Sequence, residues 1–337
     1  MKPRSFTTAH ARVILDKLES QLDRATPTMI NIREAHSNHV AEVHFDTGRN
    51  RSPAPHRPLM VGQHADPIAK HLEDCSFGDK PDLGAVNVRF WFDRQPQFDI
   101  FMSHGIGDKG WRPLKRVKDF TYVCVSGPAW RAKYEKEGLD PARILDVGYP
   151  KLDPLFDGTI PRAPRGDRIR VLYAPTHNGN QGRSSYPRMV PHLALLPPSE
   201  FEVRTSSHPR NHEANKGTLE EFAWADVVIP DTGSTLYEAM ALDLPVVVPT
   251  WLVAKSVKHP VISFESKFYR AGMGYPITKA SDIPELVTTA AEHGLGERER
   301  AFIEGIFPRD LRGRSGKLAA DTFTDIGPSA VKRRPRR

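Results

Sequence analysis

The stretch ADVVIPDTGSTLYEAMALDLPVVVPT, residues 225–250, contains one complete unit of a layered fold. Its apolar start predicts a strand that runs into a Gly/Ser turn by residue 234, and TLYEAMALD (235–243) then predicts a helix. The run LPVVVPT (244–250) predicts the next strand. A strand, a helix and a second strand in this order are typical of a parallel sheet covered by helices, so the stretch indicates an α/β fold.

The same alternation continues toward the N-terminus. Further apolar runs end in glycine, proline or polar residues and predict strands at 97–105, 120–128, 142–153, 169–176 and 201–210. The helix predicted over 129–138 ends at a glycine. The segment 156–168 carries proline and glycine and predicts a linker. We therefore predict two doubly wound Rossmann-like domains, residues 1–157 and 158–327, which face each other across a cleft.

The composition excludes several classes of protein. With 337 residues, of which 39% are hydrophobic and 26% charged, the chain is long enough for two domains and does not have the composition of a disordered protein. No apolar run approaches the roughly 18–20 residues that span a bilayer, which excludes an integral membrane protein. The two cysteines, Cys75 and Cys124, form no CxxC pair and cannot build a disulfide framework or a four-cysteine zinc site. We therefore expect a cytoplasmic protein.

The positive charge is concentrated at the C-terminus. The formal net charge is +7, and the last six residues, KRRPRR, supply five positive charges, so the rest of the chain is nearly neutral. We predict a basic, disordered tail over 328–337. Such a tail is attracted to polyanions, either nucleic acid or an anionic membrane surface, which leaves peripheral membrane association open. A solubilising end without a partner is the alternative.

The turn inside 225–250 carries the strongest candidate site. It opens a helix and consists of Asp231, Thr232, Gly233, Ser234 and Thr235. Unpaired N–H groups and the helix dipole favour an anion at such a position, so a phosphate or pyrophosphate is predicted there. Glu238, one turn further on, would accept hydrogen bonds from two ribose hydroxyls. Ordinary helix capping by Ser234 is the alternative interpretation.

Other polar residues follow predicted strands directly. His208 and Arg210 lie in the polar cluster that ends the strand predicted over 201–210, and they suit phosphate oxygens, since an arginine offers a bidentate fork. Thr176 and His177 end the strand at 169–176. Because ligands bind at the carboxyl ends of parallel strands, we expect these side chains to line one cleft. An exposed loop with incidental charges is the alternative for His208 and Arg210.

A candidate catalytic base lies in the first domain. His104 ends a predicted strand and is followed by glycines at 105, 107 and 110. A histidine titrates near neutral pH and can act as a general base. Gly105 and the glycines after it would allow the loop to close over a ligand. A structural histidine in a glycine-rich turn is the alternative.

Several of these motifs together resemble a known family. HGIGDK, SGPAWRAKYEKEGLDPARILDVGYPKLD, LYAPTH, SHPR and ADVVIPDTGSTLYEAMALDLPVV are similar to motifs of the CDP-glycerol glycerophosphotransferases, found in that order at 104–109, 126–153, 172–177, 207–210 and 225–247. These teichoic-acid primases and polymerases have the two-domain GT-B glycosyltransferase fold. The resemblance covers roughly residues 97–250 and no part of 1–96.

The resemblance implies roles for individual residues. His104 matches the family's catalytic histidine, His208 the histidine that contacts the donor phosphates, and Asp231 and Ser234 the donor turn. The chain departs from the family in reading DTGST without an aromatic residue, and in having His177 where tryptophan is frequent. Residues 1–157 would then be the acceptor side, and 158–327 would bind the nucleotide donor.

The leading hypothesis is a transferase that moves a group from a nucleotide-activated donor to an acceptor hydroxyl. CDP-glycerol and a nucleotide sugar are both open as donors. The acceptor would be a polymer or lipid-linked wall precursor; alternatively, the enzyme would glycosylate a hydroxylated base of nucleic acid. No cofactor is expected, since no metal-ligand spacing is present, although a loosely bound Mg²⁺ stays open.

Two further hypotheses remain. A nucleotide-sugar epimerase would need an acid/base pair, and none can be assigned. A non-catalytic nucleic-acid-binding module would use the basic tail and the stretch RNRSPAPHRP (49–58), which is predicted to be a loop. It would leave the polar residues of the cleft without a function.

Overall fold

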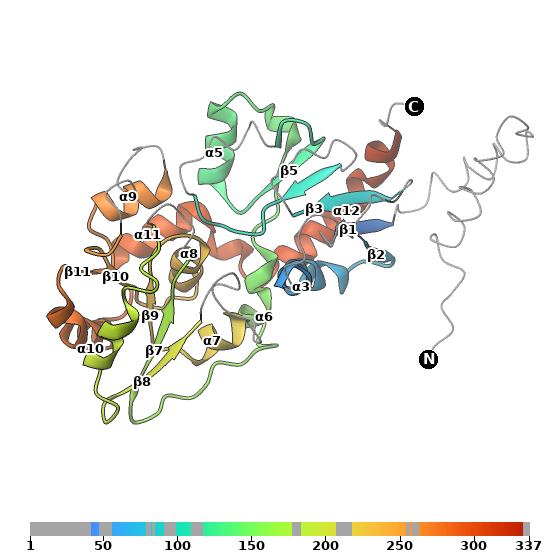
Figure 1. Ribbon diagram of the computed structural model, residues 1–337. Helices are drawn as coiled ribbons and strands as arrows, with labels where there is room; N and C mark the ends of the chain where they lie inside the picture. Colours follow the sequence, from blue (N-terminus) through green and yellow to red (C-terminus); the bar gives the residue numbers. More distant parts are fainter. Residues whose placement is uncertain are drawn as a thin grey trace, which may run out of the picture.

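The structure is a computed structural model that describes residues 42–46, 56–78, 82, 85–90, 99–108, 117–176, 183–206, 218–253, 257 and 263–332. Its strands form one parallel sheet in the N-terminal half, and a three-stranded and a two-stranded parallel sheet in the C-terminal half (Figure 1). This arrangement matches the predicted doubly wound α/β pattern.

The N-terminal sheet has six parallel strands in the order β2-β1-β3-β4-β5-β6. They are β1 (Val43–Asp46), β2 (Cys75–Gly78), β3 (Val86–Arg89), β4 (Ile100–Met102), β5 (Tyr122–Val125) and β6 (Ile144–Asp146). Every residue of β3, β4 and β5 is buried, as expected for parallel strands covered on both faces. The first three strands are short and were not predicted from the sequence.

The strands of the C-terminal half form two groups, which a single bridge joins. Strands β8 (Phe201–Thr205), β7 (Ile169–Ala174) and β9 (Val227–Pro230) are paired in that order, and β10 (Val247–Pro249) pairs with β11 (Tyr275–Ile277). A parallel bridge between Val228 and Val246 joins the two groups. The strand, turn, helix and strand predicted over 225–250 are thereby confirmed, with α8 (Ser234–Ala241) as the helix.

Helices cover both sheets. In chain order they are α3 (His56–Ala69), α5 (Pro128–Lys136), α6 (Asp153–Phe156), α7 (Thr218–Trp224), α8, α9 (Phe264–Arg270), α10 (Ile283–His293), α11 (Glu297–Ile306) and α12 (Ser315–Lys332). The helix predicted over 129–138 is confirmed as α5, and Gly138 follows it with a φ of 94°. Residues 56–58, predicted as loop, form the first turn of α3, where Pro58 is tolerated.

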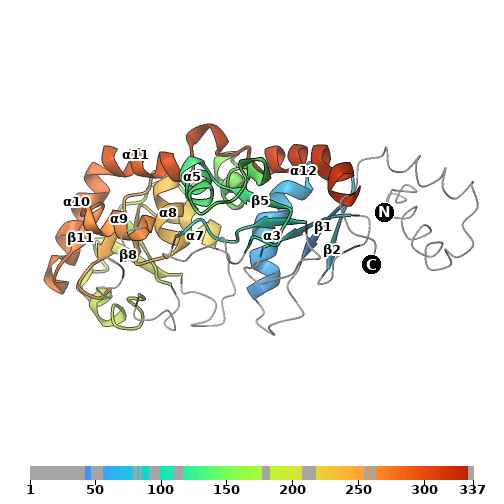
Figure 2. The same cartoon turned by 90° about the horizontal axis from the view of Figure 1, so that it is seen from above.

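The last helix packs on the N-terminal domain, although residues up to 327 are predicted to belong to the C-terminal one. The chain returns to the first half of the molecule, where α12 packs on α3 and on strands β1 and β3 (Figure 2). Ala319, Ala320 and Phe323 of α12 are buried in the N-terminal core. The helix also runs to Lys332, past the predicted end at residue 327. The position of this helix is therefore set by apolar contacts with residues far away in the sequence, which a local sequence pattern does not reveal. The tail over 333–337 lies outside the described residues.

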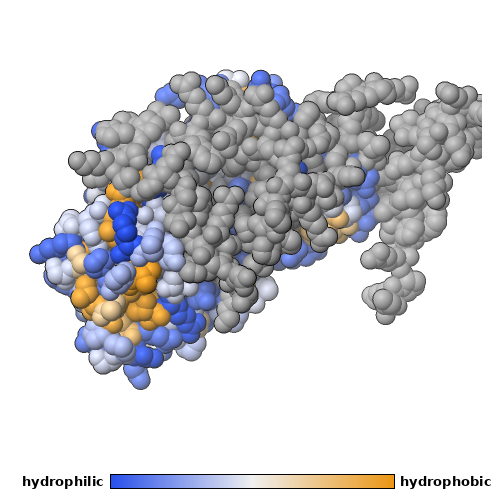
Figure 3. Space-filling view, in the orientation of Figure 1, coloured by the Kyte–Doolittle hydropathy of each residue, from blue (hydrophilic) through white to orange (hydrophobic). Residues whose placement is uncertain are grey.

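The C-terminal domain has an apolar patch on its surface. Figure 3 shows apolar side chains gathered over its lower left part. Exposed apolar residues of this domain include Val190 and Leu195, which are 43% and 44% exposed. None of the interdomain contacts described below involves these two residues. Among the described residues, no helix is both long and apolar enough to cross a membrane.

Candidate functional site

His104 lies directly after β4, with its side chain half-buried. Its Nδ1–H donates a hydrogen bond to the main-chain oxygen of Phe90, at 2.8 Å. In the neutral ring this bond fixes the proton on Nδ1 and leaves the lone pair on Nε2. The structure thus gives His104 the tautomer that a general base acting through Nε2 requires.

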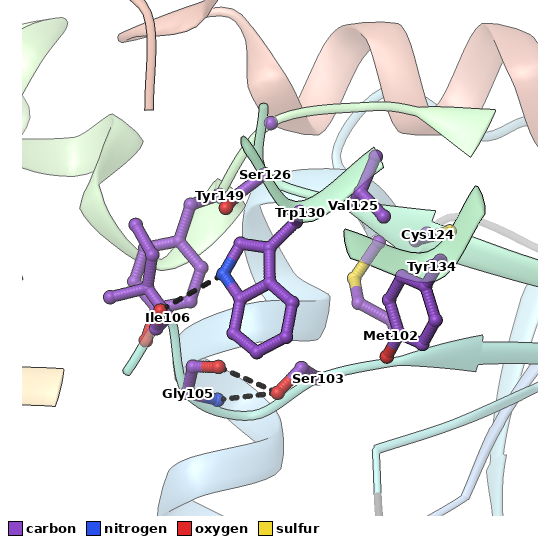
Figure 4. A pocket seen from close by; sticks show the side chains of 11 residues that line it. Met102, Ser103, Gly105, Ile106, Cys124, Val125, Ser126, Trp130, Tyr134 and Tyr149 are labelled. Atoms are coloured by element: carbon purple, nitrogen blue, oxygen red, sulfur yellow. Dashed lines mark hydrogen bonds between the residues drawn. The ribbon is translucent and has the colours of Figure 1, made fainter. Parts of the chain in front are cut away.

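The loop that begins with His104 is held by side chains of its own domain. His64 Nε2–H donates to the His104 carbonyl at 3.0 Å, and Ser103 Oγ–H donates to the Gly105 carbonyl at 2.6 Å. Trp130 Nε1–H donates to the Ile106 carbonyl at 3.1 Å (Figure 4). Three successive carbonyl groups are therefore anchored within the N-terminal domain.

Two glycines bring this loop onto the start of α8. A Cβ atom on Gly107 would lie 2.9 Å from the carbonyl carbon of Gly233 and 3.1 Å from the nitrogen of Ser234. A Cβ atom on Gly105 would lie 2.5 Å from Ser234 Oγ. Gly107 therefore needs to be glycine for the approach of the two domains, because the close atoms belong to the main chain, whereas at Gly105 the close atom is a side-chain hydroxyl that can turn away.

Asp231, predicted to bind the donor, has a different position. Its side chain is fully buried, and its carboxylate accepts hydrogen bonds from the N–H groups of Thr176 (2.8 Å), Ser185 (2.7 Å) and Thr232 (2.5 Å). Ser185 Oγ–H adds a fourth, at 2.9 Å. Burial raises the pKa of Asp231, while these donors favour the ionised form. Asp231 therefore shapes the turn from beneath and does not face a ligand.

The other residues of the turn are either buried within the protein or partly exposed at the helix start. Gly233 N–H donates to Glu265 Oε1 at 2.7 Å, and Arg183 lies 3.5 Å from the second oxygen of Glu265. Thr232 is buried. Ser234 and Thr235, the first two residues of α8, are half-buried, and Thr235 Oγ1–H donates to the Ala174 carbonyl at 3.0 Å. The part of the turn nearest to the surface is thus the helix start itself.

Glu238 also differs from its predicted role. It is fully buried, and its Oε1 accepts hydrogen bonds from Tyr149 Oη at 2.7 Å and from Lys151 Nζ at 2.8 Å. The carboxylate is used across the interface between the two halves and is not presented to a ribose. Burial raises the pKa of Tyr149 well above its usual value, and the neighbouring Glu238 raises it further.

A buried carboxylate beside the loop bonds both within the N-terminal domain and across the interface. Asp108 Oδ2 accepts hydrogen bonds from Lys133 Nζ at 2.5 Å and from the N–H of Phe264 at 3.0 Å. Because Phe264 begins α9, one carboxylate of the N-terminal domain ties α5 to the C-terminal domain. The sequence analysis missed the part that Asp108, Tyr149 and Lys151 take in the interface, although all three lie inside motifs that it quoted. It found no signal for His64.

Some predicted residues cannot be placed. His177, His208 and Arg210 lie outside the described residues. Thr176 is described: it is buried, and its carbonyl accepts a hydrogen bond from Ser184 Oγ at 2.8 Å, so its main chain supports the turn. Within the described part of the chain, no three His, Cys, Asp or Glu side chains form a group that could hold a metal ion.

The fold is that of GT-B proteins. No protein-family model matches the chain, and neither does any curated protein sequence. The solved structure of the wall teichoic acid polymerase TagF matches with a TM-score of 0.58 at 12% identity, covering 97% of this chain and 99% of that one. A TagF variant soaked with CDPG matches with a TM-score of 0.55 at 13% identity, covering 96% and 94% of the two chains. The predicted GT-B architecture with two Rossmann-like domains is confirmed.

Proposed function

We infer that the protein is a GT-B transferase that moves a group from a nucleotide-activated donor to an acceptor hydroxyl. The observation that carries this proposal is the contact of Gly105 and Gly107 with the start of α8, which brings a histidine poised as a base next to a helix N-terminus. A helix N-terminus favours phosphate, and a base beside it is what group transfer to a hydroxyl needs.

Each residue then has a defined task. Nε2 of His104 takes the proton of the acceptor hydroxyl as its oxygen attacks the donor. With CDP-glycerol as donor, a new oxygen–phosphorus bond forms, the bond from that phosphorus to the nucleotide breaks, and CMP leaves. The start of α8 at Ser234 and Thr235 would stabilise the leaving phosphate, with Gly233 allowing its close approach and Gly105 lying opposite; one such donor contributes about 3 kcal/mol to lowering a barrier.

Three residues outside the described part, together with Thr176, complete the proposed site. His208 and Arg210 would bind the donor phosphates, and Thr176 and His177 would border them. Asp231 and Glu238 act on the donor indirectly, because their carboxylates are buried and bonded within the protein. CDP-glycerol is the first donor to test, because the sequence motifs resemble those of CDP-glycerol glycerophosphotransferases.

A nucleotide screen tests the proposal. Thermal unfolding and nucleotide release would be measured with CDP-glycerol, other CDP-alcohols and UDP-, GDP- and dTDP-sugars. We expect one donor class to raise the unfolding temperature of the wild type, and His104→Ala to abolish release of the nucleotide while leaving that shift intact. His71→Ala, at an exposed histidine, is the matched control and should behave as the wild type. If no nucleotide stabilises the protein, the proposal is wrong.

A further inference from the structure

A second histidine supports His104 from behind. His64 lies on α3, is 1% exposed, and donates its Nε2–H to the carbonyl of His104 at 3.0 Å. Its ring packs against the rings of Phe90 and Tyr149, with centroids 5.7 and 5.1 Å away. Phe90 in turn offers its carbonyl to the ring of His104. One compact cluster therefore holds both the ring and the main chain of residue 104.

The hydrogen bond of the His104 ring and the hydrogen bond of the His104 carbonyl have different effects. The bond from Nδ1 to the Phe90 carbonyl sets the orientation and tautomer of the His104 ring. The bond from His64 sets the plane of the peptide between residues 104 and 105. In a trans peptide the C=O and N–H groups point in opposite directions, so drawing the carbonyl toward His64 turns the Gly105 N–H toward Ser103 Oγ, at 3.2 Å.

We propose that His64 is a positioning residue for His104, fixing the 104–105 peptide through its Nε2–H so that Nδ1 of His104 stays within hydrogen-bond reach of the Phe90 carbonyl. The proposal rests on the proposed role of His104 as the base. It adds a residue from α3, a helix that contributes none of the groups named above for the donor site.

His64 does this as a neutral donor. Burial holds the pKa of His64 well below its usual value, and the positive charge of Lys151 and the nearby His104 lower it further. Its Nδ1 has no hydrogen-bond partner. A neutral imidazole still has one N–H to give, so the His104 carbonyl is satisfied without a second cation beside Lys151.

Two variants of similar shape separate a positioning role from packing. Gln at 64 keeps an N–H donor near the place of Nε2, whereas Met fills a similar volume without a donor. We expect His64→Met to lower kcat about 100-fold with the donor KM within about two-fold, since small misplacement of a catalytic group has effects of that size. His64→Gln should recover most of kcat, although both variants lose the same ring contacts.

A double variant and a spectroscopic measurement make the outcome decisive. His64→Met should reduce turnover no further when His104→Ala is already present. Imidazole ¹⁵N shifts of His104 should report a single Nδ1–H tautomer in the wild type and in His64→Gln, and a mixture of tautomers in His64→Met, with or without a known donor.

Wild-type kcat in His64→Met, or an unchanged His104 tautomer there, would overturn the proposal even if His104→Ala is inactive. Equal impairment of His64→Gln and His64→Met, with both folded, would assign His64 to packing alone and would also overturn it. Normal turnover in His104→Ala would instead reject the proposed function.

Discussion

The two surfaces that meet at the interface are stabilised in opposite ways. On the N-terminal side, the carbonyls of the loop at 104–106 accept hydrogen bonds from the neutral side chains of His64, Ser103 and Trp130. On the C-terminal side, N–H groups around the turn at 231–233 donate to the buried carboxylates of Asp231 and Glu265. One surface has its carbonyl oxygens satisfied, and the other has its N–H groups satisfied.

This difference matters for an anionic ligand. A carbonyl that faced the start of α8 would repel a phosphate, and the side-chain donors of the N-terminal domain hold three of them elsewhere. Asp231 and Glu265 accept hydrogen bonds from N–H groups beneath the turn. The N–H groups that remain at the start of the helix are those of Ser234 and Thr235. The predictions below test how far this division holds, from the largest expected effect to the smallest.

The Lys151–Glu238 pair should contribute most to joining the two surfaces. Lys151→Met leaves the fully buried carboxylate of Glu238 without a cation and should lower the free energy of unfolding by about 3–5 kcal/mol. The double variant Lys151→Met/Glu238→Gln should recover most of this loss, because a neutral amide can still accept the hydrogen bond from Tyr149. Urea unfolding measures both. A loss of unfolding free energy below about 1 kcal/mol in Lys151→Met would contradict the description of this ion pair as buried in the interface.

Substitutions on the C-terminal surface, where buried carboxylates accept the hydrogen bonds, should lower the free energy of unfolding more than substitutions on the N-terminal surface, where neutral side chains donate them. Asp231→Asn replaces one acceptor oxygen by an NH₂ group facing backbone N–H groups, and should cost about 2–3 kcal/mol of unfolding free energy. Ser103→Ala removes the donor to the Gly105 carbonyl and the acceptor of the Gly105 N–H, in a part-buried loop, and should cost about 1 kcal/mol. The two variants would be compared in one series of urea titrations. Equal losses, or a larger loss in Ser103→Ala, would mean that the two surfaces do not differ as described.

The two glycines should respond differently to alanine. At Gly105 the added methyl meets only Ser234 Oγ, whereas at Gly107 it meets the main chain of Gly233 and Ser234. Gly107→Ala should therefore destabilise the protein by about 1–3 kcal/mol, and Gly105→Ala by less.

Ser234→Ala provides the control for the two glycine variants. Added to Gly105→Ala, it should restore the thermal midpoint of a Ser234→Ala single variant. Added to Gly107→Ala, it should restore nothing. Rescue of both glycine variants would show that the main chains are not in close contact.

The smallest effect should be a pH dependence from His64. Its pKa in the folded protein is lowered, so the unfolded chain binds more protons below about pH 6.5, and stability should fall as the pH falls. Between pH 7 and 5.5 the wild type should lose about 1 kcal/mol more than His64→Gln.

Other groups also titrate in this window. The pKa of Asp153 is raised to about 6, chiefly by burial, and its contribution has the opposite sign because it is lost as the pH rises. Taking the difference between the wild type and His64→Gln removes it. Parallel stability curves for the two proteins would show that His64 is not held neutral by the fold.

The sequence predicted those parts of the fold in which apolar runs are long and end in glycine or polar residues. Strands β5, β7 and β9 and helices α5 and α8 fall inside their predicted ranges or within a residue of them. Helix α3 has prolines at 58 and 67 and no clear apolar stripe, so neither it nor His64 could be recognised.

The contacts of the interface could not be predicted from local sequence patterns, for a different reason. Glu238 looked like a ribose ligand because it follows a helix start, but its partners Tyr149 and Lys151 come from a turn almost ninety residues earlier. The same holds for Asp231, whose donors Thr176 and Ser185 belong to a different strand and loop. Motif spacing drew attention to the turn, and only the packing of the two domains shows that the carboxylates of Asp231 and Glu238 are bonded within the protein.

The contact between the loop and the start of α8 is the central feature, and glycine-selective ¹⁵N labelling tests it most directly. Amide signals of Gly105, Gly107 and Gly233 would be followed while CDP-glycerol, and then the panel of sugar nucleotides, is added. We expect these three signals to shift together and to saturate at the same concentration, while Gly138 and Gly158, where an added side chain would meet open space, stay unchanged. A nucleotide that stabilises the protein without shifting these signals would place the donor elsewhere and contradict the proposed site.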